Sequence, residues 1–266
     1  MSQKYNNLKK IIFDYQSRGK YSFSINEIRQ LLQINKNSLR IALSRQADKN
    51  QILSIRKGFY LIIPPEYSYT GILPPEMFIH NLMSFLKINY YVGLMTATMY
   101  HGASHQKPQE FFVIVEKIPL RTIEKNGVRI DFITKKNLNP DGISQIKTTT
   151  GYMNISNPEM TFLDLLIYEN RIGGINRAIE MMLEINDTLS ITRFKRIVNN
   201  VPITVLQRAG YILENFLEKQ NFADFIFNYL KNKLFYRTGL SLASKNTGNC
   251  SNRWKVIENV KLEIER

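Results

Sequence analysis

Apolar residues near the start of the chain recur every three or four positions, the spacing of amphipathic helices. They predict a first helix over residues 4–17, which Arg18-Gly19-Lys20 ends because glycine suits the position after a helix. Tyr21 and Phe23 then predict a short extended link. The apolar positions of this helix are Leu8, Ile11, Ile12 and Tyr15.

A second helix is predicted over residues 24–33. Ser24 and Glu27 have the spacing of a capping box, in which each side chain satisfies a free backbone N–H. After the turn at Ile34-Asn35-Lys36, a third and more basic helix begins, with Asn35 or Asn37 as its cap. The inward side chains expected on the two helices are Ile25, Ile28, Leu31 and Leu32, then Leu39, Ala42, Leu43 and Ala47.

Residues 52–62 follow with two short β-rich runs that meet at Arg56-Lys57-Gly58, a hairpin tip in which glycine can adopt positive φ. Two helices joined by a tight turn and followed by a hairpin are typical of a winged helix-turn-helix. We therefore predict this domain over residues 1–66, with a Pro-rich linker at about 64–75.

The remaining residues, 76–266, alternate helices and strands and predict a second, larger domain. The fold class expected for the whole chain is α+β, mostly helical, with the N-terminal winged helix-turn-helix joined to a C-terminal α/β domain that ends in helices. Ser156 is expected to cap a helix with Pro158 in its first turn and Glu159 at capping-box spacing. Helices are predicted over 76–87, 94–102, 175–185, 190–199, 202–220 and 222–234, strands at 111–115, 129–133, 151–155 and 254–257, and a loop at 237–253.

Charge is concentrated at the start of the chain. The formal net charge is +14, and residues 1–60 hold twelve Lys/Arg against three acids, Asp14, Glu27 and Asp48, so this stretch supplies +9. Such clustering favours a polyanionic partner. One cysteine, a polar start and the lack of a long apolar run predict a cytoplasmic protein without disulfides, signal peptide or membrane partner.

The outward side of the third helix predicts a double-stranded DNA contact. Asn37, Arg40 and Ser44 are the candidate readers of base edges, because Arg and Asn are suited to guanine and adenine in the major groove. Lys36 and Arg45 flank them as phosphate contacts. Arg56 and Lys57, at the hairpin tip, are expected to contact the DNA backbone or minor groove. This assignment rests on helical phase.

Three segments resemble the AbiEi family of antitoxins from type IV toxin–antitoxin systems of bacterial abortive infection. They are ILPPEMFIHNLM, YYVGLMTATMYHGASHQKPQEFFVIV and IKTTTGYMNISNPEMTFLDLL, followed by Gly173-Gly174. The resemblance covers about residues 8–235. It implies an N-terminal winged helix-turn-helix that binds inverted repeats in its own promoter and represses it. It also implies a C-terminal domain that counteracts a nucleotidyltransferase-like toxin without a stable complex.

Signals for an enzyme are weak. His101 and His105 have metal-ligand spacing, with His80 or Glu110 as possible further ligands, but H-G-A-S-H lacks the glutamate of a zincin. Cys250 has no evident base beside it. Asp131 and Asp164 are single carboxylates. We therefore predict no catalytic residue, no metal and no cofactor.

Two alternatives stay open: a winged-helix regulator with a sensor domain and no toxin role, and a nucleic-acid-processing enzyme. The basic residues of the C-terminal region are expected to be solvated, although they could also contact RNA or DNA. They are Lys195, Arg196, Lys231, Lys233 and Arg237.

Overall fold

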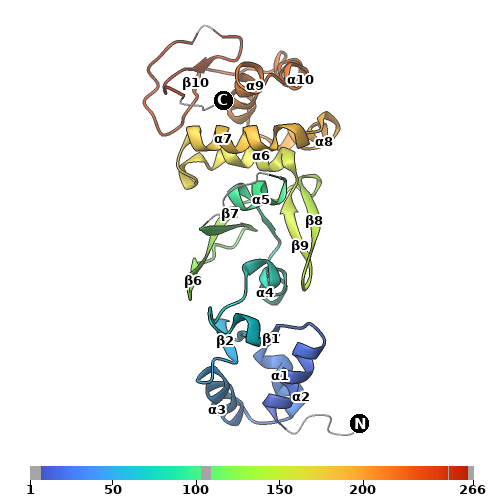
Figure 1. Cartoon of the computed structure of the whole chain (residues 1–266). Coiled ribbons are helices and arrows are strands. Elements are labelled where there is room, and N and C mark those ends of the chain that lie inside the picture. Colours follow the sequence, from blue (N-terminus) through green and yellow to red (C-terminus); the bar gives the residue numbers. More distant parts are fainter. Residues whose placement is uncertain (1–6, 103–108, 251, 263–266) are drawn as a thin grey trace. The chain divides into compact units, whose positions relative to one another are not determined.

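A computed structural model describes residues 7–102, 109–250 and 252–262 of the chain (Figure 1). The chain forms two compact units. Unit 1 comprises Met1–Tyr91, Gln109–Leu138 and Gln145–Asn154, and unit 2 comprises Val92–Pro108, Asn139–Ser144 and Ile155–Arg266. The two domains expected at 1–66 and 76–266 remain a prediction.

Unit 1 begins with three helices and three short strands. The order is α1 (Leu8–Ser17), β1 (Ser22–Ser24), α2 (Ile25–Leu32), α3 (Lys36–Ala47), β2 (Ile52–Arg56) and β3 (Phe59–Ile62). Gly19 has φ +70° just after α1, as its place in the sequence predicts. The capping box of Ser24 and Glu27 is present. Asn35, rather than Asn37, caps α3, by accepting a hydrogen bond from Ser38 N at 2.8 Å.

One hydrophobic core joins these elements, with Ile11, Ile28 and Leu39 fully buried at its centre. Two inward assignments from the sequence are wrong. Leu31 is 43% exposed, because the core takes Ile28 and, one turn later, the half-buried Leu32, which leaves Leu31 off that face. Ala47 is exposed because it is the last residue of α3, beyond the turn that Leu43 buries.

The three strands form an antiparallel sheet in the order β1-β3-β2. Ile52 pairs with Ile62 and Arg56 with Phe59, so Lys57 and Gly58 make the turn. Gly58 has φ +85°, and a side chain there would meet Ile25 at 3.4 Å and the Phe85 ring at 3.5 Å. The turn therefore needs glycine for its conformation, and it lies packed against other parts of unit 1.

A turn-rich stretch with two 3₁₀ helices, η1 (Pro65–Tyr67) and η2 (Pro75–Met77), leads into α4 (Ile79–Leu86). The helix expected over 76–87 is thus split, since the hydrogen bonds of its first turn are of the 3₁₀ type. After α4 the chain enters a sheet.

The sheet has six strands in the order β6-β7-β5-β4-β9-β8. β5 and β7 are parallel over seven residue pairs, and β6 is antiparallel to β7 across the Asn126-Gly127 turn. β4 and β9 are parallel. The sequence predicted β5, β7 and β9 but not the other three strands. The bounds are β4 (Tyr90–Val92), β5 (Glu110–Glu116), β6 (Ile123–Lys125), β7 (Val128–Lys135), β8 (Ile143–Thr148) and β9 (Gly151–Ser156).

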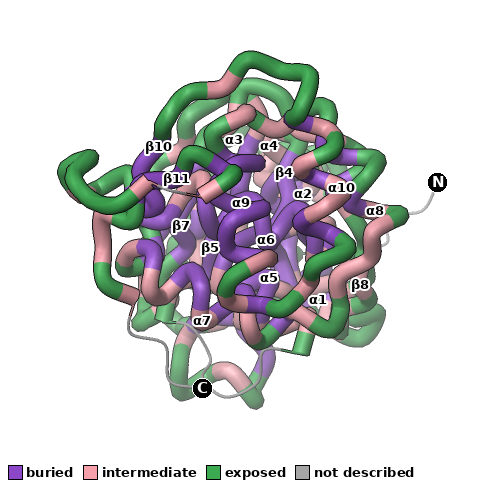
Figure 2. Tube along the Cα trace, turned by 90° about the horizontal axis from the view of Figure 1, so that it is seen from above, coloured by how far each residue is buried: buried purple, intermediate pink, exposed green. Residues whose placement is uncertain are grey.

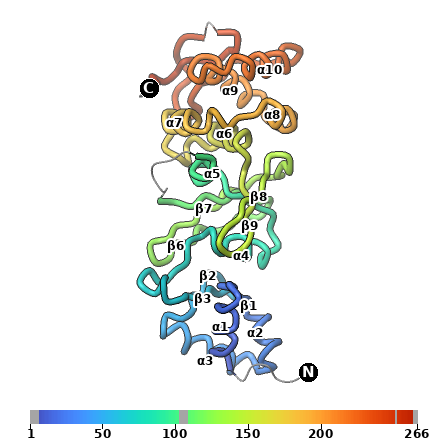
Figure 3. Tube along the Cα trace, turned by 45° about the vertical axis from the view of Figure 1, so that its right-hand side comes forward, coloured from blue at the N-terminus to red at the C-terminus, as the bar shows by residue number. Residues whose placement is uncertain are grey.

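Unit 2 is mainly helical. α6 is buried from Glu159 to Leu166, and its trace is mostly purple in Figure 2. α9 and α10 lie side by side (Figure 3). The helices are α5 (Leu94–Tyr100), α6 (Pro158–Ile167), α7 (Ile175–Ile185), α8 (Ile191–Ile197), α9 (Ile203–Asn215) and α10 (Gln220–Leu230), with 3₁₀ turns at η3 (Pro140–Gly142), η4 (Glu169–Arg171), η5 (Asn186–Thr188) and η6 (Val198–Asn200).

The C-terminal region does not end in helices as the expected fold class states, and the last short strand predicted within residues 254–257 is present. After α10, a parallel pair of two-residue strands forms, β10 (Thr238–Gly239) with β11 (Val256–Ile257). Trp254 is fully buried, and its ring lies so close to Gly210 of α9 that any side chain at that position would clash with it. This tail of the chain is therefore part of the core of unit 2.

Candidate nucleic-acid interface

The outward side of α3 carries every helical residue that the sequence proposes for DNA contact. Leu39 and Leu43 pack into the core and fix the helix in place. None of the twelve residues of α3 is acidic. Ile41 lies on the same outward side and is 55% exposed. All five proposed contacts on the helix are exposed: Lys36, Asn37, Arg40, Ser44 and Arg45.

The cations of α3 have no acidic partner in the described part of the chain, unlike Arg18 and Lys20 of the same unit. Among the described residues, Lys36, Arg40 and Arg45 form no ion pair. In contrast, Arg18 lies 2.7 Å from Asp14, and Lys20 pairs with Glu27. The positive charge of α3 is therefore uncompensated within the described residues.

The pairing of Lys20 is reinforced by its surroundings. Burial alone would raise the pKa of Glu27, but hydrogen bonds from Lys20 and Tyr15 outweigh it, and the pKa lies below its ordinary value. The Tyr15 hydroxyl donates to Glu27 Oε1 at 2.6 Å, and the Lys20 ammonium lies 4.1 Å from the Tyr15 ring centroid. Lys20 therefore stabilises the fold of unit 1 and is committed to Glu27.

The two predicted contacts of the hairpin tip have different environments. Arg56 donates from its guanidinium to the carbonyl of Arg121 and lies 5.5 Å from the Phe132 ring centroid. Burial, and then the charge of Arg121, lower the pKa of Arg56. Lys57 is exposed. Lys57 is thus available for a partner, whereas Arg56 already has contacts within unit 1.

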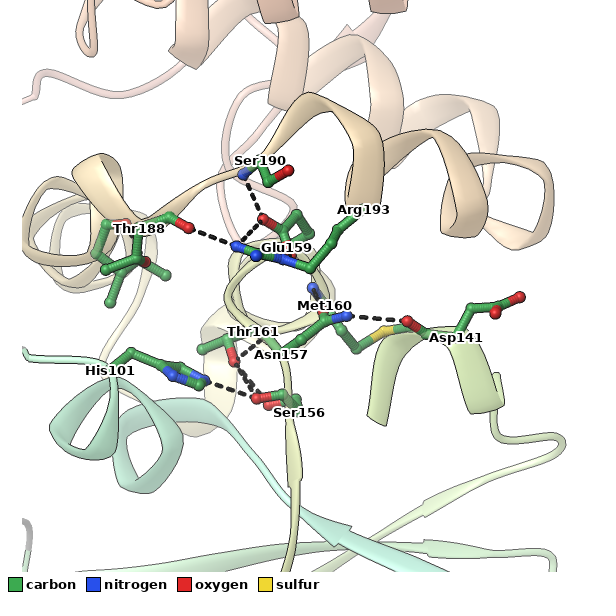
Figure 4. A network of polar contacts seen from close by, with 11 residues as sticks. His101, Asp141, Ser156, Asn157, Glu159, Met160, Thr161, Thr188, Ser190 and Arg193 are labelled. Carbon is green, nitrogen blue, oxygen red and sulfur yellow. Dashed lines mark hydrogen bonds and ion pairs between the residues drawn. The ribbon is translucent and has the colours of Figure 1, made fainter. Parts of the chain in front are cut away.

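A buried polar centre lies at the start of α6 in unit 2 (Figure 4). Pro158 occupies the first turn, and the helix cap is Asn157, whose Oδ1 accepts from Met160 N at 2.9 Å. The sequence had assigned Ser156 as the cap. The correction follows from Pro158, because the residue before proline is extended and so takes the cap position.

The sequence predicted that Glu159 closes a capping box at the start of α6. In the structure it does not. Its side chain is fully buried and accepts hydrogen bonds from Ser190 N at 2.5 Å and from Arg193 Nε at 2.8 Å (Figure 4). A second Arg193 bond, Nη2 to Oε1, measures 3.0 Å. Glu159 therefore ties α6 to the start of α8 instead of to its own backbone.

His101 belongs to the same centre and has a structural role there. Its Nε2 lies 2.6 Å from the Ser156 carbonyl oxygen, which can only accept, so Nε2 carries the proton. Burial lowers the pKa of His101, and the hydrogen bond with Ser156 and the charge of Glu159 offset this in part. His105, the other member of the candidate metal pair, lies outside the described residues.

Both aspartates that the sequence singles out, Asp131 and Asp164, are buried. Asp131 accepts a hydrogen bond from the Thr122 hydroxyl at 2.9 Å, and Cys250 is a half-buried free thiol. Gly174 is the N-cap of α7, not part of a strand-to-helix phosphate loop. In the described part of the chain, no three His, Cys, Asp or Glu side chains gather as metal ligands, and no helix is long and apolar enough to cross a membrane.

Unit 2 also contains an ion pair that is buried on both sides and that no sequence pattern indicates. Arg208 of α9 pairs with Glu169, and both side chains are almost completely buried. Glu169 Oε1 also accepts from the Ser241 hydroxyl at 3.1 Å and from Leu242 N at 2.7 Å, which fastens the tail of the chain. The partners are 39 residues apart, so no local pattern could have paired them.

The comparison with known families decides the identity of this region. Residues 91–215 match the family model of the AbiEi antitoxin C-terminal domain. This part of the chain is an AbiEi antitoxin C-terminal domain. The match contains the whole polar centre around Glu159. The AbiEi family is not an enzyme family, and the matched domain points to an antitoxin role in a toxin–antitoxin system.

The fold of the chain is also found in a solved structure of low sequence similarity. The crystal structure of the RV2827C protein from Mycobacterium tuberculosis superposes with a TM-score of 0.69 at 11% identity. The alignment covers 94% of this chain and 90% of that one. At this identity the likeness concerns the fold alone. Comparison with curated protein sequences gave no significant match.

Proposed function

We propose that the protein is a DNA-binding transcriptional repressor of its own operon and the antitoxin of a type IV toxin–antitoxin system. In this proposal residues 1–66 are a winged helix-turn-helix that binds inverted repeats in the promoter. The remaining region, from residue 76, counteracts a nucleotidyltransferase-like toxin without forming a stable complex with it.

The observation that carries the DNA-binding half is the outward face of α3. Arg40 and Arg45 are exposed and without an acidic partner among the described residues, while Leu39 and Leu43 fix the opposite face in the core. A rigid helix that presents cations and amides outward fits a major groove. The antiparallel pair β2 and β3 stands where a wing would be, directly after this helix.

Within this interface we assign different roles to different positions. Asn37, Arg40 and Ser44 read base edges, and Lys36, Arg45 and Lys57 contact phosphates. Arg56 is the weakest of the seven sequence candidates, because its guanidinium already contacts Arg121 and Phe132. The antitoxin half of the proposal is supported by the family match at residues 91–215.

The two halves are separable by one experiment in cells. A reporter fused to the upstream region measures repression, and growth during expression of the neighbouring toxin gene measures protection. We expect the double variant Arg40→Ala/Arg45→Ala to lose repression and keep protection. The matched control Arg18→Ala removes an exposed arginine that pairs with Asp14, and it should keep both.

Two results would contradict the proposal. If the double variant still represses at matched protein levels, α3 does not contact the promoter. If the wild-type protein does not restore growth against the toxin, the chain is a regulator without antitoxin activity.

A further inference from the structure

Unit 2 carries exposed cations that have no acidic partner. Lys195 and Arg196 lie on α8, and Lys231, Lys233 and Arg237 follow the end of α10; all five are exposed. Within the described residues none of them forms an ion pair. The sequence explains why: residues 188–213 and 225–257 contain no Asp or Glu.

The only acid of α10 is already neutralised. Asp224 lies 2.9 Å from Arg253 and also accepts a hydrogen bond from Gln220. The surface formed by α8 and α10 is thus positively charged. This surface belongs to unit 2, whereas α3 belongs to unit 1. We call this surface, formed by α8, α10 and residues 231–237, the α8/α10 face.

Two of its cations are held by aromatic rings. Lys195 Nζ lies 5.5 Å from the Phe225 ring centroid, and Lys233 Nζ lies 3.9 Å from that of Tyr229. Phe225 and Tyr229 are one helical turn apart, so they share a side of α10. Phe194 of α8 meets the Phe225 ring edge-on and fixes it. Rings that hold flexible lysines reduce the entropy lost when the ammonium groups bind a phosphate chain.

The segment that follows α10 offers a place for an unpaired base. Tyr236 is 71% exposed, yet its backbone is anchored, because its carbonyl accepts from Gln207 Nε2 at 2.8 Å. An exposed aromatic ring on a fixed backbone is a stacking platform. Exposed amide side chains that could hydrogen-bond base edges lie on α10 or just after it: Asn221, Asn228 and Asn232.

We propose that the α8/α10 face binds single-stranded nucleic acid. Lys195, Arg196 and Lys233 contact phosphates, and Tyr236 stacks on a base. Duplex DNA or an acidic peptide would satisfy the cations but would leave Tyr236 unused, since stacking on a side chain requires an unpaired base. The inference does not depend on promoter binding, which uses α3 of unit 1.

The test is a fluorescence anisotropy titration of the full-length protein with labelled oligo-U RNA and oligo-dT DNA of about twelve nucleotides, a length within the usual site sizes. The titration is repeated at several salt concentrations. Lys195→Ala/Lys233→Ala should reduce the salt slope for single strands by about 1.4, or about 0.7 for each phosphate contact. Tyr236→Ala should weaken binding by about tenfold, and Tyr236→Phe should bind like the wild type.

Matched controls test whether single-strand binding depends on this face or only on the net positive charge of the protein. Tyr69→Ala removes a fully exposed tyrosine of unit 1, and Lys136→Ala/Lys147→Ala removes two exposed lysines; both should leave single-strand affinity unchanged. Trp254 is the single tryptophan and is fully buried in unit 2. Its unchanged emission in each variant shows that the fold is intact.

Three results would overturn the inference: wild-type affinity in Tyr236→Ala, equal loss of duplex and single-strand binding in the lysine double variant, or displacement of the oligonucleotide by poly-glutamate at equal charge concentration. The variant Arg40→Ala/Arg45→Ala is tested in the same titration. It should lose promoter binding and keep single-strand binding. A failure of the proposed promoter binding is therefore distinguished from a failure of the proposed single-strand binding. The comparison of oligo-U with oligo-dT decides between RNA and DNA as the ligand.

Discussion

Arg193 and Glu159 form an ion pair with two hydrogen bonds, at 2.8 and 3.0 Å, in which the carboxylate side is fully buried. Arg193 also donates to the Thr188 carbonyl at 2.6 Å. One side chain thus fixes α6, the segment before α8 and the start of α8 itself. The pair lies within the part of the chain that matches the antitoxin domain.

Removing Arg193 should therefore destabilise unit 2 strongly. In Arg193→Ala the buried carboxylate of Glu159 loses its cation, and we expect a loss of about 3 kcal/mol in the free energy of unfolding. Chemical denaturation measures it. Arg177→Ala is the matched control, because Arg177 lies 2.8 Å from Glu180 in a pair that is exposed on both sides. Its cost should stay below about 1 kcal/mol. Equal costs for the two variants would show that burial of Glu159 is unimportant.

His101 should make stability depend on pH in a defined window. Burial lowers its folded-state pKa below the ordinary value of 6.5, so the unfolded chain binds more protons in the interval between the two values. The contribution of His101 is therefore present above about pH 6.5 and is lost as pH falls toward the folded pKa.

Denaturation at a series of pH values tests the role of His101. His101→Gln keeps a donor for the Ser156 carbonyl but does not titrate. Its stability should fall less steeply than that of the wild type below pH 6.5. Identical slopes for the two proteins would exclude His101 as the source of the dependence.

The first half of this fold was readable from the sequence because its signals are local. The capping box at Ser24 and the glycines at 19 and 58 act over a few residues, and the structure has them as predicted. The Asn126-Gly127 turn fixed the β6–β7 hairpin in the same way. Strand β5 was recognisable because five consecutive apolar residues, Phe111 to Val115, are buried.

What could not be predicted depends on distant partners. Glu159 has capping-box spacing, but Arg193, 34 residues later, determines its role. The short strand β4 has only three residues and exists because β5 and β9 flank it. At the candidate interface, helical phase placed Arg40 and Arg45 outward correctly. Helical phase gave no means to foresee that Arg56 would contact Arg121 and Phe132.

The two neighbours at the hairpin tip should respond differently to alanine. Arg56→Ala removes a hydrogen bond and a ring contact, so we expect a loss of about 1 kcal/mol in stability with the DNA salt slope unchanged. Lys57→Ala should leave stability unchanged and reduce the slope by about 0.9, because one phosphate contact is lost. Denaturation and DNA binding are measured on both variants. The reverse pattern would place Arg56, not Lys57, on the DNA.

Ile41 is the apolar side chain on the outward side of α3, and apolar groups in the major groove contact thymine methyls. We expect Ile41→Ala to weaken operator binding by about 1 kcal/mol, or about fivefold. Replacing the contacted thymine by uracil removes the same methyl contact from the DNA side. In a double-mutant cycle the two changes together should then cost no more than either alone. Additive losses at every thymine of the operator would contradict this contact.

The salt dependence of operator binding by Arg40→Ala and Arg45→Ala tests most directly whether α3 contacts the promoter. We expect Arg45→Ala to lower the slope of log affinity against log salt by about 0.9, as for one lost phosphate contact. Arg40→Ala should cost about 1–3 kcal/mol on the operator and much less on unrelated duplex DNA. Wild-type affinity and slope in both variants, with Arg18→Ala as the matched control, would show that α3 does not read the promoter.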